Sequence, residues 1–138
     1  MPEPETTTPD TPMPPPAPGE ARIMEFVFPS DTNPQGNLFG GALVAWMDKA
    51  AAFAAIRRSH GSVVTAAIEG LTFSVPIRQG DMVELVGVVE HVGRTSMRVH
   101  VQVWRESHRG DQAQLATEGR FTMVAINEDG RPRPVDPG

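Results

Sequence analysis

The stretch GGALVAWMDKAAAFAAIRR, residues 40–58, decides the fold of this chain. It is rich in alanine, contains no proline and is apolar nearly all the way round, which predicts a buried helix. The Ser-His-Gly break at residues 59–61 ends this helix. Its apolar part is shorter than the roughly 20 residues of a membrane span, and Asp48 and Lys49 interrupt it. We therefore expect a helix that lies inside a globular fold.

Blocks of apolar or alternating residues of strand length predict a sheet around this helix. One block lies before the helix at residues 22–28, and four follow it at residues 63–75, 81–92, 95–106 and 114–126. The block at 95–106 is the clearest, because its predicted core face consists of Met97, Val99, Val101 and Val103. Gly93 and Arg94 form a tight link, which favours antiparallel pairing. The sequence predicts an α+β fold whose sheet curls around one long helix.

The first 20 residues differ in composition from the rest of the chain. They hold eight of the 14 prolines, four acidic residues and no basic residue, which is typical of a disordered tail. We predict a tail at residues 1–20 and one domain at residues 21–138. The net charge of −5 comes almost entirely from the tail, so the domain is nearly neutral and nucleic acid is not an expected partner. No secretory signal pattern is visible, and we expect a cytoplasmic protein without membrane association.

Several kinds of chemistry are excluded or left without support. The chain has no cysteine, which excludes disulfides, thiolate catalysis and cysteine-bound zinc. The four histidines show no helical i, i+4 pair and no carboxylates at the spacing of metal ligands; they are His60, His91, His100 and His108. A G-x-S-x-G elbow, a P-loop and a dinucleotide motif are all missing. We expect neither a metal nor a cofactor.

Asp48 is the helix residue that most needs an explanation. Its neighbours at three- and four-residue spacing are apolar and cannot pair with a carboxylate; they are Val44, Ala45, Ala51 and Ala52. Burying an unpaired charge is costly. Asp48 is therefore either held by an arginine or a loop, or placed where a cleft or a subunit interface reaches it. The residues alone leave both open. Glu69, in a predicted strand, is a second acid–base candidate or, as we favour, a solvent-facing residue.

The start of the helix offers a place for a developing negative charge. Gly40 and Gly41 leave room for a ligand near first-turn amides that have no intrahelical partner. Such amides, aided by the helix dipole, can polarise a thioester carbonyl. Alternatively, the glycines only permit close packing. Asn33, in the preceding loop, either orients a water or the substrate carbonyl or is an ordinary turn residue.

Five blocks in order carry a family resemblance. The run PSDTNPQGNLFGG at residues 29–41, followed by WMD at 46–48, closely resembles hotdog-fold acyl-CoA thioesterases, namely the small bacterial YciA type and the mammalian brain-type cytosolic hydrolases. The other matching blocks lie at residues 64–73, 76–81, 93–97 and 121–125. The likeness covers residues 22–134. It implies a long helix wrapped by a five-stranded antiparallel sheet and a double-hotdog dimer, often a trimer of dimers.

The resemblance also implies the activity and its residues. It makes Asp48 the catalytic carboxylate, as general base or as nucleophile, and it places Asn33 and the amides of Gly40 and Gly41 around the thioester carbonyl at a dimer interface. A homodimer is also expected on physical grounds, because an open sheet edge and an apolar helix both need cover. The implied reaction converts fatty acyl-CoA to free acid and CoA. CoA is then part of the substrate rather than a cofactor.

Two segments are implied as the binding site for CoA. They are Ala66, Ala67 and Ile68 in one strand, and Arg94, Thr95, Ser96 and Met97 around a hairpin. A hydratase of the same fold is disfavoured, because residues 29–48 contain no histidine. The alternative that we keep is a non-catalytic acyl-CoA sensor. The length of the preferred acyl chain is not predictable from these residues.

Overall fold

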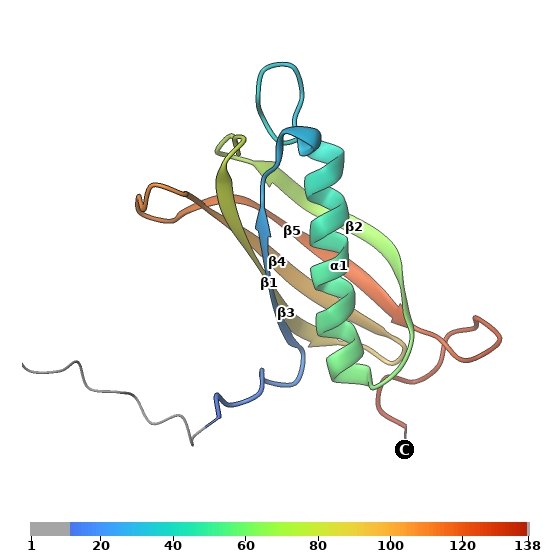
Figure 1. The fold of residues 1–138 in the computed structure, drawn as a ribbon. Helices are drawn as coiled ribbons and strands as arrows, with labels where there is room; N and C mark the ends of the chain where they lie inside the picture. The colour runs from blue at the N-terminus through green and yellow to red at the C-terminus, as the bar shows by residue number, and fades with distance from the viewer. Residues whose placement is uncertain (1–11, 138) are drawn as a thin grey trace, which may run out of the picture.

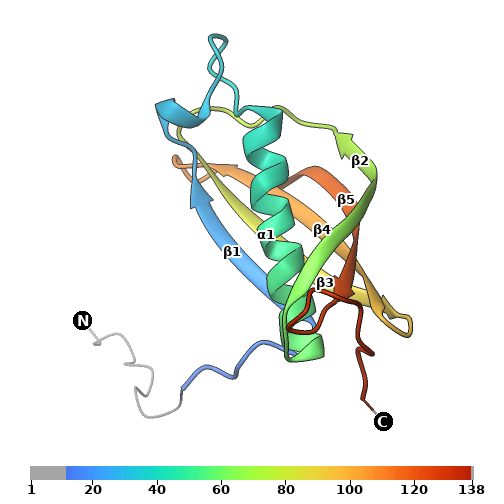
Figure 2. The same cartoon turned by 90° about the vertical axis from the view of Figure 1, so that its right-hand side faces the viewer.

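The computed structural model describes residues 12–137 and shows one long helix lying across a curved five-stranded sheet (Figures 1 and 2). The elements in chain order are β1 (Glu20–Phe26), a 3-10 turn (Pro29–Asp31), α1 (Gly40–Ser59), β2 (Val63–Phe73), β3 (Asp81–Val92), β4 (Ser96–Ser107) and β5 (Gln114–Ala125). The predicted α+β architecture and all six predicted elements are confirmed, with ends that differ by two residues at most. The predicted tail falls largely on residues 1–11, which lie outside the described residues.

The sheet is antiparallel throughout and has the strand order β1-β3-β4-β5-β2. The strands β3, β4 and β5 are joined by consecutive hairpins and form its centre. The strand that follows the helix, β2, pairs only with β5 and is therefore an edge strand within this chain. Figure 1 shows β2 curving along one side of α1. This arrangement leaves one long edge of the sheet next to the helix without a neighbour.

The core lies between α1 and the concave face of the sheet. The predicted core face of β4 is confirmed, because Met97, Val99, Val101 and Val103 are all fully buried. The alternate residues of β4 point to the other face, where His100 contacts Glu118 at 3.0 Å. The period of two in the sequence therefore separated the inner from the outer side of this strand correctly.

Small side chains bring α1 close to the sheet. Four alanines of the helix are fully buried in the core, at positions Ala50, Ala51, Ala54 and Ala55. Opposite them, β3 carries Gly87, and a Cβ atom at that position would lie 3.0 Å from the backbone oxygen of Ala50. The close packing of helix on sheet therefore requires a glycine at this point.

We expect Gly87→Ala to destabilise the fold. The added methyl group meets backbone rather than a movable side chain, and overpacking of this kind costs about 1–3 kcal/mol. The measurement is urea unfolding followed by circular dichroism. The matched control is Gly40→Ala, since a Cβ there meets nothing within 4 Å, and it should leave the midpoint unchanged or higher. An unchanged midpoint for Gly87→Ala would contradict the packing described here.

The expectation that the helix carries more apolar surface than one small sheet can cover is confirmed for the single chain. The sheet covers only one side of α1, and Phe53 and Ile56 on the helix remain 45% and 41% exposed. The strand β2 is also exposed along most of its length, with Val64 at 45% and Ile68 at 39%. The physical reason is that a five-stranded sheet of this size cannot enclose a 20-residue helix. Apolar surface is left beside the free edge.

A buried ion pair fixes the connection between β2 and β3. The Asp81 carboxylate is 5% exposed and accepts two hydrogen bonds of 3.1 Å from the Arg105 guanidinium. This pairing raises the pKa of Arg105 above its ordinary value. Asp81 also accepts a 2.8 Å hydrogen bond from the backbone N–H of Arg78. The segment that precedes β3 is therefore held firmly next to the start of α1.

Candidate active site

Asp48 lies in the third turn of α1, on the side that faces β2. The Thr65 hydroxyl on β2 donates a hydrogen bond of 2.5 Å to Oδ1 of Asp48. Asp48 is only partly buried, and within residues 12–137 no arginine, lysine or histidine forms an ion pair with it. The alternative in which an arginine neutralises this carboxylate is therefore not realised. One oxygen of Asp48 is held, and the other is left for a water or a substrate.

The sequence did not reveal Thr65 as a partner of Asp48. It lies at the start of an exposed edge strand, 17 residues after the aspartate. The signal that was available is the chain reversal at residues 60–62, which lays β2 back along the helix. Whether Thr65 reaches Asp48 depends on the length of the turn between α1 and β2 and on the path of β2 along the helix. No local sequence pattern gives either of these.

We expect Thr65→Val to lower the kcat of the thioester hydrolysis that the family resemblance implies, with KM little changed. Thr65 acts through Asp48 as a positioning residue, and a reacting group that moves by about 1 Å can lose about 10²-fold in rate. Thr65→Ser keeps the hydroxyl and should restore most of the rate. Steady-state kinetics of the three proteins measures the effect. Equal losses in the valine and serine variants would show that the methyl group, rather than the hydrogen bond, matters.

The amino end of α1 is open. Phe39 precedes the first turn and provides no side-chain cap. Gly40 and Gly41 are exposed, and a Cβ atom at either position meets nothing within 4 Å. Within one chain these glycines therefore do not serve close packing. They leave the first-turn amides accessible, as a site for a carbonyl oxygen requires.

Asn33 shapes the loop that leads to the helix. Its Oδ1 accepts hydrogen bonds of 3.0 Å from the N–H of Gln35 and 3.1 Å from the N–H of Asn37. The turn interpretation is therefore correct for the carbonyl side of this amide. Its side-chain nitrogen makes no hydrogen bond within the described part of the chain, so the NH₂ group remains a donor for a ligand.

The predicted catalytic residues do not all meet within one chain. Eight residues separate Gly40 from Asp48, which corresponds to about 12 Å along an α-helix at 1.5 Å per residue. Asn33 belongs to the loop between the 3-10 turn and the start of α1, on the far side of Gly40 along the chain; this loop lies at the top of Figure 1. A thioester carbonyl bound at the amide of Gly40 is thus out of reach of Asp48 in the same chain.

The predicted CoA segments lie along the free edge of β2 and at the hairpin between β3 and β4. Ala66, Ala67 and Ile68 are exposed along the free edge of β2. Thr65 on β2 pairs with Met123 on β5, and Met123 in turn pairs with Met97 on β4. The hairpin at residues 94–96, which leads into β4, therefore lies two strands away from the free edge of β2. The side chains of Arg94, Thr95 and Ser96 are exposed or partly exposed there.

Two of the singled-out side chains have other roles in the structure. The side chain of Met97 is fully buried in the core, so that only its backbone can serve a ligand. Glu69 is 62% exposed and pairs with Arg98 at 3.5 Å, which agrees with the solvent-facing interpretation that we favoured. Neither side chain approaches Asp48 in the described contacts.

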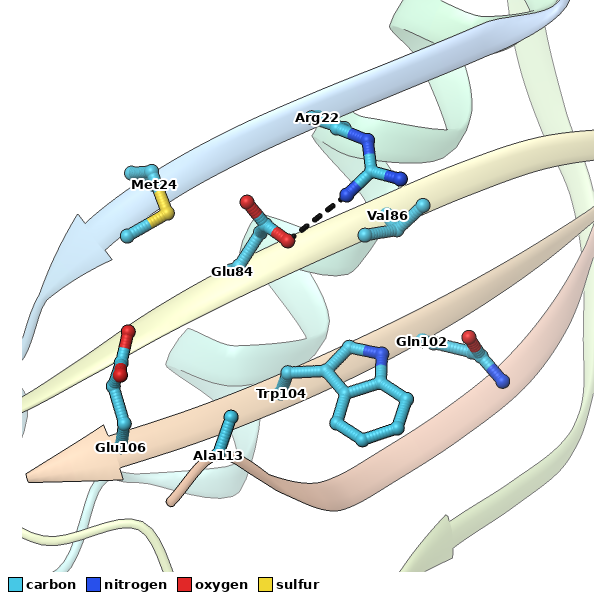
Figure 3. A pocket seen from close by; sticks show the side chains of 8 residues that line it. All are labelled: Arg22, Met24, Glu84, Val86, Gln102, Trp104, Glu106 and Ala113. Carbon is cyan, nitrogen blue, oxygen red and sulfur yellow. Dashed lines mark hydrogen bonds and ion pairs between the residues drawn. The ribbon is translucent and has the colours of Figure 1, made fainter. Parts of the chain in front are cut away.

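Two cavities accompany these residues. The larger, of about 420 Å³, lies on the outer face of the sheet (Figure 3). Side chains of β1, β3 and β4 line it, and its cation, Arg22, is paired with Glu84 at 3.0 Å. The sheet separates this cavity from Asp48. The second, of about 350 Å³, lies between the first turn of α1 and the β2–β3 connection, at the end of the helix where the open amides are.

The described residues contain no group of three or more acidic or histidine side chains that could hold a metal ion. In the same range, no helix is long and apolar enough to cross a membrane. The polar groups described above are the Asp48 carboxylate, the Thr65 hydroxyl, the Asn33 carboxamide and the backbone amides at the start of α1. Such a set can activate a water molecule and stabilise an oxyanion.

The fold and the helix carboxylate define a hotdog protein of the hydrolytic kind. The family model of the thioesterase superfamily matches residues 35–111, which is more than half of the chain. The acyl-CoA thioester hydrolase YciA of Salmonella typhimurium is 37% identical over 133 residues, which cover 94% of this chain and 96% of that protein. The chain belongs to the thioesterase superfamily.

Solved structures agree with this assignment. One such structure is an acyl-CoA hydrolase from Staphylococcus aureus in complex with butyryl coenzyme A and coenzyme A. It is 33% identical to this chain with a TM-score of 0.81, and the match covers 86% of this chain and 72% of the hydrolase. The same protein was crystallised with one asparagine, one aspartate or one threonine changed to alanine. A hexameric acyl-CoA thioesterase is 39% identical with a TM-score of 0.82, covering 85% of this chain and 75% of that one.

Proposed function

We propose that this chain is an acyl-CoA thioester hydrolase that uses Asp48 as its catalytic carboxylate. The observation that carries the proposal is the partly exposed Asp48, held by Thr65 through one oxygen and free of any cation in the described residues. The three residues substituted in the Staphylococcus aureus hydrolase are spaced 15 and 17 residues apart. Asn33, Asp48 and Thr65 have the same order and the same spacings in this chain.

Each residue has a defined task in this reaction. Thr65 orients Asp48, which either removes a proton from the attacking water or attacks the thioester carbonyl itself to form an anhydride. The amides at Gly40 and Gly41 and the side-chain NH₂ of Asn33 donate to the oxygen that becomes negative. CoA leaves as the thiol, and the acid is released. The carboxylate and the donors act from opposite sides of the carbonyl.

A homodimer joined through β2 supplies both halves of this site. If two copies pair antiparallel about Ile68, the middle residue of β2, Thr65 of one copy lies opposite Leu71 of the other. The end of β2 that follows Leu71 lines the same cavity as Gly40. Asp48 of one copy therefore lies near the open helix end of the second. Small residues on the Asp48 side of α1, at positions Gly41, Ala45 and Ala52, permit the second helix to approach.

Further features belong to the same proposal. Arg94 is an exposed guanidinium that suits a phosphate of CoA, and the exposed backbone at Ala66 to Ile68 suits the pantetheine amides. A trimer of such dimers would match the hexameric relatives. We also propose a cytoplasmic location and a role in fatty acid metabolism, because acyl-CoA is the substrate. Cell fractionation tests the location, and acyl-CoA profiling of a deletion strain tests the metabolic role.

The test is the release of thiol from acyl-CoAs of graded chain length by the purified full chain. We expect turnover that depends on acyl length, with kcat/KM of about 10⁴ M⁻¹s⁻¹ or more for the best substrate. Binding of acyl-CoA without turnover of any chain length would replace the hydrolase by the sensor. None of the comparisons favours that alternative, since the relatives are named as hydrolases.

A further inference from the structure

The cavity of about 350 Å³ at the start of α1 has an apolar wall and polar groups that lack partners. Much of the wall comes from Leu43 on the helix, Phe73 at the end of β2, and Val75 and Ile77 in the connection that follows β2. The backbone N–H of Leu38 donates to the oxygen of Ile77 at 2.7 Å, which closes one side. The cavity is at the small end of the range of ligand pockets, roughly 300–1,000 Å³.

Thr117 is the polar group at the base of this cavity. It lies on the helix-facing side of β5, where the following inward positions are Gly119, Phe121, Met123 and Ala125. Thr117 is only 2% exposed, lines the cavity, and its hydroxyl has no hydrogen-bond partner in the described structure. Among these inward positions of β5 it is the one side chain that can donate a hydrogen bond.

Asn37 adds a second unpartnered group to the same cavity. Its Oδ1 atom is buried and accepts no hydrogen bond in the described structure, and the residue lines the cavity with Thr117. Buried polar groups of proteins are nearly always hydrogen-bonded. Two unpartnered groups beside one cavity therefore favour an occupant that brings a polar group to them.

The chemistry of these two groups selects the occupant. The Thr117 hydroxyl can donate and accept, whereas Oδ1 of Asn37 can only accept. A carboxylate offers no proton to Asn37, and a plain hydrocarbon chain satisfies neither group. A hydroxyl on an otherwise apolar chain can donate to Asn37 or accept from Thr117, while its carbons meet the apolar wall.

We propose that this cavity holds the acyl group of the substrate and selects short acyl thioesters that carry a hydroxyl group on the chain, with Thr117 and Asn37 as the groups that recognise it. The proposal rests on the proposed hydrolase function, because it needs the thioester carbonyl at the amide of Gly40. Gly40 itself lines the cavity. An acyl chain that leaves that carbonyl therefore enters the cavity directly.

The test compares kcat/KM for butyryl-CoA with that for 3-hydroxybutyryl- and 4-hydroxybutyryl-CoA. The wild type should prefer at least one hydroxylated substrate by about tenfold, the usual size of one hydrogen-bond difference. Thr117→Val keeps the shape and removes the hydroxyl, and it should bring the ratio of kcat/KM for the preferred hydroxylated substrate to that for butyryl-CoA down to about one. The control is Thr122→Val on the outward side of the same strand, which should leave the ratio unchanged.

Failure of this inference can be told apart from failure of the proposed function. Turnover of all three substrates at similar rates by the wild type, or an equal loss on all of them in Thr117→Val, would overturn the hydroxyl selectivity and leave the hydrolase intact. If no substrate were turned over, calorimetry with butyryl-CoA and 3-hydroxybutyryl-CoA themselves gives the same comparison from binding. Equal affinities there would also overturn the proposal.

Discussion

Asp48→Asn should lose about three orders of magnitude in kcat, within the 10²–10⁴-fold that a positioned general base contributes. The amide has the same shape and can still accept the hydrogen bond from Thr65, so the fold and the neighbouring strand should be unaffected. It cannot take a proton from water, and it is a poor nucleophile. The loss should appear in kcat for every acyl length, because the change removes chemistry and leaves the binding surfaces in place.

The measurement is thiol release by wild type and variant of equal urea stability and equal size by gel filtration. The control is Glu69→Gln, which removes an exposed carboxylate from β2 that pairs with Arg98 on the outer face. It should retain nearly full activity. Comparable rates for Asp48→Asn and wild type would remove Asp48 from the reaction and leave the helix-end amides as the whole catalytic apparatus.

Oxygen labelling separates the two roles of Asp48. With enzyme in excess in H₂¹⁸O, a general-base reaction puts the label into the released acid in the first turnover. A nucleophilic reaction that passes through an anhydride, and in which water attacks the aspartyl carbon, leaves the label in Asp48 instead. Mass spectrometry of the acid and of the helix peptide reads both outcomes.

The fold was predictable from the sequence because its signals are local. The period of two in β4 separates four buried residues from their outward neighbours, and the alanine-rich run without proline specifies α1. The expected end of the helix is also local, since His60 adopts a left-handed conformation with φ 57° immediately before Gly61. Each of these features depends only on residues within a few positions along the chain.

The parts of the site that the sequence analysis did not predict depend on contacts between residues that are distant in sequence. The hydrogen bond from Thr65 to Asp48 joins an edge strand to a helix. The unpartnered Thr117 matters because β5 passes beneath the first turn of α1, which no pattern in β5 itself reports. The apolar surface of α1 that a second copy is expected to cover includes Phe53, which no local pattern identifies.

Mixing two inactive variants should restore activity. Asp48→Asn lacks the carboxylate, and Asn33→Ala lacks the side-chain NH₂ that we place at the thioester oxygen. If each site takes Asp48 from one copy and Asn33 from the other, a mixed dimer has one site with both defects and one with none. Random pairing makes half of the dimers mixed, so an equal mixture should recover about a quarter of wild-type activity, as follows from two-fold symmetry.

The experiment unfolds the two variants together, refolds them and measures thiol release against refolded wild type. A mixture of Asp48→Asn with the double variant Asp48→Asn/Asn33→Ala is the control, and it should stay inactive because no pairing restores the carboxylate. If Asn33 and Asp48 served the same site within one chain, every site in the first mixture would be defective and no activity would return. The result therefore tests directly whether each site is shared between two copies. In one chain about 12 Å of helix separates Gly40 from Asp48, so only the helix start of a second copy can lie beside Asp48.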